Sequence, residues 1–177
     1  GINEMKQRIG NGISQQKVVE KKLSDSEQRF NMAMDASQDG LYDWDLLTNK
    51  IYYSPGWKRL IGYQDNELPN EISVLERLTH PEDIDKAWIM QQELLEKRQD
   101  RFEIEFRMKH KSGHWVDILS RAKAIFDENG KAVRIVGTHV DISKLKQVEK
   151  ELSDSEARFR AIYEHAPVLI NAFDENG

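Results

Sequence analysis

The stretch from Arg101 to Ile142 carries the clearest alternation of apolar and polar side chains in the chain. From Phe102 to Lys109 every second residue is apolar, and this period of two is typical of a strand that buries one face. A second apolar run covers Trp115–Phe126, and a third covers Lys131–Ile142. The Ser-Gly and Asn-Gly pairs between the runs suit tight turns, because glycine accepts a positive φ. The pattern predicts a three-stranded antiparallel meander.

Shorter elements are predicted upstream of this meander. In chain order they are strands over Leu41–Leu46 and Ile51–Tyr53, a helix opened by Ser54-Pro55, a helical turn at Asp65–Leu68, and helices over Ile72–Leu78 and Pro81–Arg98. The predicted inward stripe of the last helix is Ile84, Trp88, Gln91 or Gln92, and Leu95. Two strands, several helices and three strands predict an α+β domain, a five-stranded antiparallel sheet with helices on one face.

The order of short motifs in this region resembles a known family. The motifs are Lys111-Ser112-Gly113-His114-Trp115, Asp127-Glu128-Asn129-Gly130-Lys131 and Gly137-Thr138-His139-Val140-Asp141-Ile142-Ser143. Together they resemble the C-terminal half of a PAS sensor domain, the part called the PAC motif, as found in bacterial sensory box proteins. The resemblance reaches back to about Phe30, and it implies the PAS fold for residues 30–142.

The ten residues from Lys21 to Phe30 return almost unchanged from Lys150 to Phe159. Eight of the ten positions are identical in the two segments. A repeat at this distance indicates repeated domains rather than a solenoid. We therefore expect a piece of a tandem PAS array: a linker helix at 1–29, the PAS/PAC domain at 30–142, a connecting helix at 143–158 and the start of a second PAS domain at 159–177.

Both repeated segments carry a narrow apolar seam at heptad spacing, which is typical of a coiled coil. The first seam holds Ile2, Met5, Ile9, Val19, Leu23, Phe30 and Ala33, and it is interrupted at Gly12, Gln16 and Ser26. The second seam holds Leu145, Val148, Leu152, Phe159 and Ile162. Each helix could instead pack on its own domain, and the spacing leaves both alternatives open. Because Gly10 and Gly12 are poor helix formers, we expect a firm helix only from about Ser14.

Composition narrows the classes of function. Asp and Glu number 31 against 26 Lys and Arg, which argues against a nucleic-acid-binding surface. The absence of cysteine excludes disulfides, thiolate metal sites and cysteine-based catalysis. No apolar run approaches the roughly 20 residues that cross a bilayer. We expect a cytoplasmic location and no membrane contact by these residues, which is compatible with a membrane segment elsewhere in a longer parent protein.

The histidines are the first candidates for site chemistry. His80 precedes Pro81 and is predicted to cap or turn the chain at the helix entry; by resemblance to haem-binding PAS domains, a haem ligand is the alternative. His110 and His114 flank a turn, which makes a zinc site unlikely without further ligands. His139, inside a strand, fits a structural or a functional role equally well.

The interior of the predicted domain is rich in large side chains. The candidates for lining a pocket are Trp44, Tyr53, Trp57, Trp88, Phe106 and Ile118. Aromatic residues of this kind fill cores more often than they line cofactor sites, so no cofactor is predicted. Haem, a non-covalent flavin or a small metabolite stay compatible with the sequence, whereas a flavin–cysteinyl adduct is excluded by the missing thiol.

The resemblance implies a sensory module that dimerises and passes a cue through its flanking helices to an output domain. By resemblance that output is a histidine kinase or a diguanylate cyclase. The signal-relay and dimerisation candidates are Val19, Leu23, Phe30, Asp141, Leu145 and Leu152. The alternative is a sensor of redox state, gas or light that carries haem or flavin. No catalytic constellation is present in the sequence, so we expect no enzymatic activity from these residues.

Overall fold

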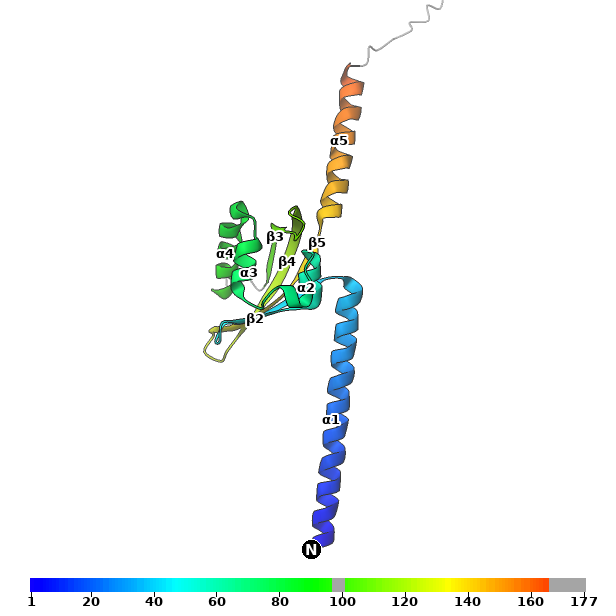
Figure 1. Cartoon of the computed structure of the whole chain (residues 1–177), viewed down its shortest axis with the longest axis vertical. Helices are drawn as coiled ribbons and strands as arrows, with labels where there is room; N and C mark the ends of the chain where they lie inside the picture. The colour runs from blue at the N-terminus through cyan, green and yellow to red at the C-terminus, as the bar shows by residue number, and fades with distance from the viewer. Residues whose placement is uncertain (97–100, 166–177) are drawn as a thin grey trace, which may run out of the picture. The chain divides into compact units, whose positions relative to one another are not determined.

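The computed structural model describes residues 1–96 and 101–165 of the chain. Its elements are α1 (Ile2–Ser37), β1 (Gly40–Asp45), β2 (Lys50–Tyr53), α2 (Pro55–Leu60), the 3-10 helix η1 (Asp65–Glu67), α3 (Ile72–Leu78), α4 (Pro81–Leu95), β3 (Phe102–Lys109), β4 (Trp115–Phe126), β5 (Ala132–Asp141) and α5 (Ser143–His165). The chain divides between Asp141 and Ile142 into two units. The first holds α1 and the α+β domain, and the second holds α5 (Figure 1).

The five strands form one antiparallel sheet in the order β2-β1-β5-β4-β3. The first and last strands of the domain, β1 and β5, therefore lie side by side in the middle of the sheet. The buried cluster joins the inner face of the sheet to α2, α3 and α4 through Trp57, Val74 and Leu94. The predicted α+β class and the five-stranded sheet with helices on one face are confirmed.

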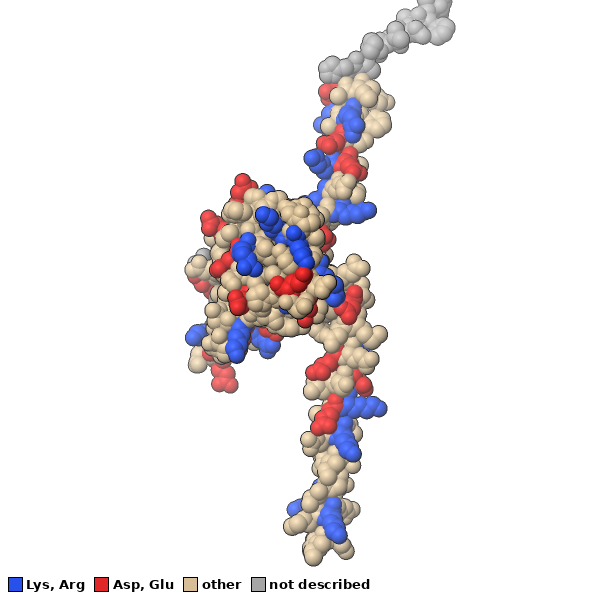
Figure 2. Space-filling model, viewed as in Figure 1, with Lys and Arg blue, Asp and Glu red and all other residues tan. Residues whose placement is uncertain are grey.

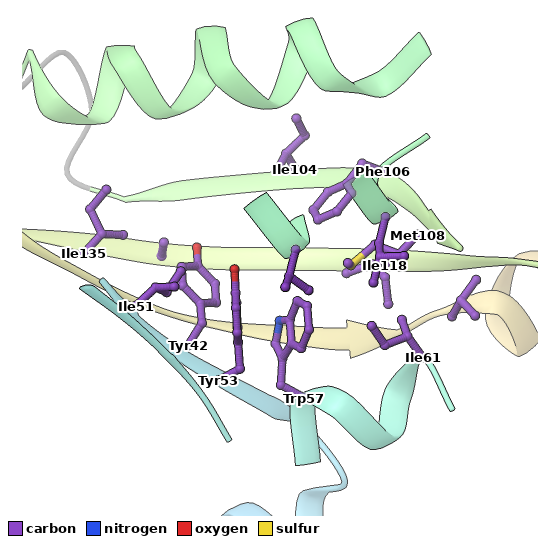
Figure 3. Packing of buried hydrophobic residues seen from close by; sticks show 14 of the residues in the cluster. Tyr42, Ile51, Tyr53, Trp57, Ile61, Ile104, Phe106, Met108, Ile118 and Ile135 are labelled. Atoms are coloured by element: carbon purple, nitrogen blue, oxygen red, sulfur yellow. The ribbon is translucent and has the colours of Figure 1, made fainter. Parts of the chain in front are cut away.

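The alternation that predicted the meander matches the burial of β3. Phe102, Ile104, Phe106 and Met108 are buried, while Glu103 and Glu105 are exposed. Phe106 lies opposite Ile118 of β4, so the two strands present their apolar side chains to the same core (Figure 3). The turn glycines Gly113 and Gly130 have φ values of 97° and 79°, which are costly for residues with a Cβ.

Helix α2 is held against β1 by its own first turn. The Ser54 hydroxyl accepts hydrogen bonds from the Trp57 backbone N–H at 3.1 Å and from the Leu41 backbone N–H at 3.0 Å. A Cβ at Gly40 would lie 2.5 Å from the Trp57 Cα, so only glycine allows this approach. As a result the Trp57 indole, 1% exposed, enters the core.

The prediction for the start of the N-terminal helix was wrong. Helix α1 runs without interruption from Ile2 to Ser37 through Gly10 and Gly12. A glycine inside a helix costs about 1 kcal/mol relative to alanine. Unlike proline, it keeps the backbone N–H that the helix uses, and it does not clash with the preceding turn. Two such residues weaken the helix without breaking it, because good helix formers follow one another in residues 4–8 and predominate in residues 15–23.

Apolar side chains on both faces of the sheet predict that its outer face is covered too, by the repeated helix or by a second copy of the chain. Helix α1 buries none of its residues, so it does not act as this lid within the chain. It meets the domain near its C-terminal end, where Arg59 Nη2 lies 3.2 Å from Asp35 Oδ1. Trp115 and Ile125, which point to the outer face, remain 40% and 49% exposed. Cover by a second copy stays a prediction.

Several element ends differ slightly from their predicted positions. Strand β1 covers Gly40–Asp45 rather than Leu41–Leu46. Helix α4 is described to Leu95, and the predicted end at Arg98 lies outside the described residues. In its inward stripe Gln91 is half-buried and Gln92 exposed, while Leu94, which the stripe omitted, is buried. Leu94 lies three residues after Gln91 and therefore on the same side of the helix.

Helix α5 covers Ser143–His165, so the helix continues beyond the predicted domain boundary at residue 159. Residues 166–177, the rest of the predicted second PAS domain, lie outside the described part of the chain. In the described part, no helix combines the length and the apolar character that crossing a bilayer requires.

Candidate functional site

A cavity of about 50 Å³ lies between the inner face of the sheet and helices α3 and α4. Aliphatic and aromatic side chains supply most of its wall, and a few polar groups from the strands and helices complete it. The lining residues are Tyr42, Trp44, Ile51, Ile72, Leu75, Glu76, Thr79, Ile84, Ala87, Trp88, Gln91, Leu94, Phe102, Phe106, Ser120, Ala122, Ile135 and His139. Apolar walls with a few placed polar groups are typical of small-molecule sites.

Three polar side chains meet on the floor of this cavity, one from each of three adjacent strands. Ser120 of β4 and His139 of β5 are direct cross-strand partners, and the Tyr42 ring of β1 lies 4.9 Å from the His139 ring between centroids. All three residues are buried. A Cβ at Gly137 would lie 2.6 Å from the Tyr42 ring, so this glycine lets the tyrosine lie across β5.

His139 is neutral, and its tautomer is fixed by Trp57. The Trp57 indole N–H donates a hydrogen bond of 2.8 Å to His139 Nδ1. Since an indole N–H can only donate, Nδ1 must accept, and the single proton of the neutral ring lies on Nε2. Burial lowers the pKa of His139 to about 3, because the charged imidazolium is poorly solvated there. His139 therefore presents an Nε2–H donor and no positive charge.

The two hydroxyl groups beside His139 share one hydrogen bond. Tyr42 Oη and Ser120 Oγ lie 3.4 Å apart, and either can donate to the other. Burial raises the pKa of Tyr42 to about 12, which keeps the phenol protonated at neutral pH. The hydroxyl pair thus carries two protons and uses one of them internally.

The side of the cavity formed by α3 and α4 carries its remaining polar groups. Glu76 is exposed, and Gln91 is half-buried. The Trp44 and Trp88 rings meet edge to face at 6.5 Å between centroids. Thr79 Oγ1 donates to the Leu75 carbonyl at 2.7 Å, so this hydroxyl can only accept a further hydrogen bond. Glu76 is the one charged residue among the lining residues described above.

The structure divides the six predicted pocket residues into two groups. Trp44, Trp88 and Phe106 line the cavity. Tyr53 and Trp57 stack on each other at 4.0 Å between centroids and fill the core near α2, as Figure 3 shows. Ile118 of β4 is fully buried. These last three residues support the cavity rather than line it.

The six relay candidates belong to three elements of the described chain, α1, β5 and α5. Val19, Leu23 and Phe30 lie on α1 with exposed fractions of 63%, 59% and 50%. Leu145 and Leu152 of α5 are 56% and 60% exposed. Asp141 is the last residue of β5, paired with Ile118 in the sheet register.

The structure assigns a local role to the other histidines. His80 caps α4, its Nδ1 accepting from the Glu82 backbone N–H at 3.2 Å, which confirms the predicted capping role. His110 and His114 stack at 4.3 Å and share the Ser112 hydroxyl in the β3–β4 turn. Over residues 1–96 and 101–165 no three His, Asp or Glu side chains are grouped to hold a metal.

The residues around the cavity do not fit haem or flavin. His80, the haem-ligand candidate, does not line the cavity, and its ring packs edge-on against Trp115 at 4.4 Å. His139 lines it, but a protonated Nε2 has no lone pair for iron, and Nδ1 is taken by Trp57. A cavity of about 50 Å³ is also far smaller than the roughly 300 Å³ at which sites for larger ligands begin.

Sequence reasoning missed Tyr42 and Ser120 of the cavity floor and left the role of His139 open. A signal was available, because Ser120 continues the inward positions of Val116 and Ile118, and His139 continues those of Ile135 and Gly137. A polar residue at an inward strand position must find a partner or a function.

Comparisons with known proteins agree with the observed fold. A family model described as "PAS fold" matches residues 50–139. The two-component sensor PprA of Pseudomonas aeruginosa is 28% identical over 119 residues, which cover 67% of this chain and 12% of that protein. The sensor protein FixL of Bradyrhizobium diazoefficiens is 29% identical over 152 residues, covering 85% and 29% respectively. The chain thus spans less than a third of either relative.

Solved structures show the same fold. A sensory box histidine kinase/response regulator from Burkholderia thailandensis has 33% identity and a TM-score of 0.64, covering 75% of this chain and 98% of that one. A diguanylate cyclase with a PAS/PAC sensor from Marinobacter aquaeolei, compared through its N-terminal domain, has 21% identity and a TM-score of 0.54, covering 61% and 98%. With the family model matched over half of its length, this chain belongs to the PAS family.

Proposed function

We propose that this chain is the sensory module of a signal-transduction protein and that it relays a cue through α1 and α5 to an output domain elsewhere in its parent protein. Relatives named as sensors, a histidine kinase and a diguanylate cyclase support a kinase or cyclase as that output. The proposal includes a cytoplasmic location for the module. No catalytic step is assigned to this chain.

The observation that carries the proposal is the exposed apolar seam of α1. Six of its side chains are between 50% and 77% exposed: Ile2, Met5, Ile9, Val19, Leu23 and Phe30. Along α1, Figure 2 shows uncharged surface between charged side chains of both signs. Apolar residues at heptad spacing on an isolated helix are stabilised when a second helix covers them.

A second copy of the chain is the partner we propose for this seam, in a parallel dimer centred on Val19–Phe30. The second seam, through Leu145 and Leu152 of α5, repeats the same spacing after Asp141 ends the sheet. A cue that shifts the two copies against each other would change the register or rotation of these helices. Such a shift biases an output that has two states.

Sedimentation velocity of the wild type and of Leu23→Glu, at matched concentrations, tests the dimer. The substitution places a charge in the seam, where its desolvation is not compensated, so we expect self-association to weaken at least about tenfold. Gln28→Glu is the matched control, because it adds the same charge on the far side of the helix. A monomeric wild type, or equal association of both variants, would contradict the proposal.

A further inference from the structure

The side chains on the floor of the cavity carry more hydrogen-bond donors than they use among themselves. Tyr42, Ser120 and His139 carry three protons on side-chain O and N atoms at neutral pH. One proton is used between Tyr42 Oη and Ser120 Oγ. Within residues 1–96 and 101–165, the His139 ring makes one hydrogen bond, at Nδ1 with Trp57, which leaves its Nε2–H available. Two donors thus remain for a molecule that brings its own acceptor.

The charges around the cavity restrict that molecule further. Among the described lining residues the only formal charge is the Glu76 carboxylate, and no Lys or Arg lines the cavity. An anion would meet Glu76 without a compensating cation. A cation could pair with Glu76, but this carboxylate is exposed, and on the buried floor the cation would meet the donor hydrogens of His139 and the hydroxyl pair. A buried charge without a partner is strongly disfavoured, so an uncharged molecule fits best.

We propose that this cavity binds a small uncharged molecule with a carbonyl-type oxygen, held by the His139 Nε2–H and by the free hydroxyl proton of the Tyr42–Ser120 pair. The remainder of the molecule is apolar and lies against Phe106, Trp88 and their aliphatic neighbours. This inference rests on the proposed sensory function and names the chemistry of its cue.

The size of the cavity sets the scale of the ligand. A volume of about 50 Å³ exceeds the roughly 10–15 Å³ needed for one water, and it suits a compact molecule of a few non-hydrogen atoms. The aromatic wall provides apolar area, while the strand residues provide the polar contact. Amides, ketones and similar neutral carbonyl compounds combine these two properties.

The Trp57–His139 hydrogen bond offers a direct readout. An acceptor on Nε2–H polarises the imidazole and strengthens the bond at Nδ1, because hydrogen bonds in a chain reinforce one another. The indole N–H resonance of Trp57 should therefore shift when the cavity fills. Trp44 and Trp88 line the same cavity and should respond as well, so Trp115, which lies outside the cavity, reports whether the response is confined to this site.

Titration of the full chain with propionamide, propionate and n-propylammonium, followed by indole ¹⁵N–¹H spectra, separates the possibilities. The three probes are similar in size and differ in charge, and n-propylammonium also lacks the carbonyl oxygen. We expect a saturable shift of the Trp57 signal with propionamide and at least about tenfold weaker binding of both ions. Equal binding of all three probes, or a propionamide response that does not saturate, overturns the proposal.

Two variants and a control complete the test. His139→Phe removes the donor and should weaken propionamide binding about three- to tenfold. Ala122→Leu fills the cavity from its floor and should abolish binding even if His139→Phe does not fold. His114→Gln, an exposed position in the β3–β4 turn, should bind as the wild type does. Unchanged binding in Ala122→Leu would place the probe elsewhere and overturn the proposal.

These results are independent of the dimer test. If propionamide fails to bind while Leu23→Glu still weakens association, only the ligand proposal is lost. If ligand binding succeeds and the wild type is monomeric, the relay through α1 is lost instead.

Discussion

The PAS domain and helix α1 differ in the burial of their apolar side chains. Between Gly40 and Asp141 the apolar positions of each strand meet those of α2, α3 and α4 in one buried cluster. In α1 apolar side chains recur at heptad spacing with interruptions at Gly12, Gln16 and Ser26, and the helix buries no residue. Apolar surface is stabilised by removal from water. The PAS domain achieves this within one chain, whereas the apolar side chains of α1 stay exposed.

This difference separates two kinds of information in the sequence. A substitution in the domain core is felt by a single chain and should change the free energy of unfolding. A substitution in the seam of α1 should leave that free energy nearly unchanged and alter association.

The largest effect is expected for Phe106→Ala. Phe106 is 6% exposed, lies opposite Ile118 and contacts the His139 ring edge to face at 5.3 Å between centroids. Large-to-small changes in a core leave unfilled space, so the free energy of unfolding should fall by about 3–5 kcal/mol. Urea denaturation followed by tryptophan fluorescence measures this loss.

Glu103→Ala is the control on the same strand. Glu103 points outward, and its ion pair with Arg121 at 2.8 Å joins two side chains that are each 56% exposed. Exposed pairs contribute at most about 1 kcal/mol. A loss below about 1 kcal/mol for Phe106→Ala, similar to that of Glu103→Ala, would mean that the inward face of β3 was assigned incorrectly.

A smaller effect is expected on acidification. Burial lowers the pKa of His139 to about 3, below its ordinary value of 6.5. Between these values the unfolded chain binds more protons than the folded chain, so the stability from neutral His139 is complete above pH 6.5 and is lost as the pH falls toward 3. Denaturation at pH 7 and pH 5 should differ by roughly 2 kcal/mol from this residue.

Other groups change stability in the same direction and need a control. Burial also lowers the pKa of His110, which therefore contributes in the same pH window. Hydrogen bonds to Arg107 lower the pKa values of Glu82 and Asp83, whose contribution is lost only at more acidic pH. His139→Gln should remove about 1 kcal/mol per pH unit from the slope between pH 6.5 and 5. If His110→Gln flattens the slope instead, His139 is not the responsible group.

The sequence predicted the parts of the fold that follow from local periodicity. Strand β4 and helix α3 lie at their predicted residues, and the Ser54-Pro55 start of α2 is confirmed through the Ser54 hydroxyl. These elements repeat one structural preference over several residues, so single exceptions do not hide them. The length of α1 was underestimated because glycine was treated as a helix end rather than as a modest local cost.

The cavity could not be predicted in the same way. Its floor depends on β1 and β5 becoming neighbours, which places Tyr42 within 4.9 Å of His139 although 97 positions separate them in the sequence. The tautomer of His139 depends on Trp57, which approaches only because Gly40 has no side chain. Periodicity shows which face a residue takes, whereas the partners on that face are determined by the tertiary arrangement.

The smallest effect concerns the two glycines of α1, one of which lies in the apolar seam and one outside it. Gly10 and Gly12 both have open space around their Cα atoms, so a leucine fits sterically at either position. Each substitution should favour the helix by up to about 1 kcal/mol and raise the circular dichroism signal at 222 nm to a similar extent. Gly12 interrupts the seam, since it lies seven residues after Met5 and seven before Val19. Gly10 lies outside the seam. Only Gly12→Leu should therefore strengthen self-association, measured by sedimentation equilibrium. Equal strengthening by Gly10→Leu would show that helix content rather than the seam controls the dimer.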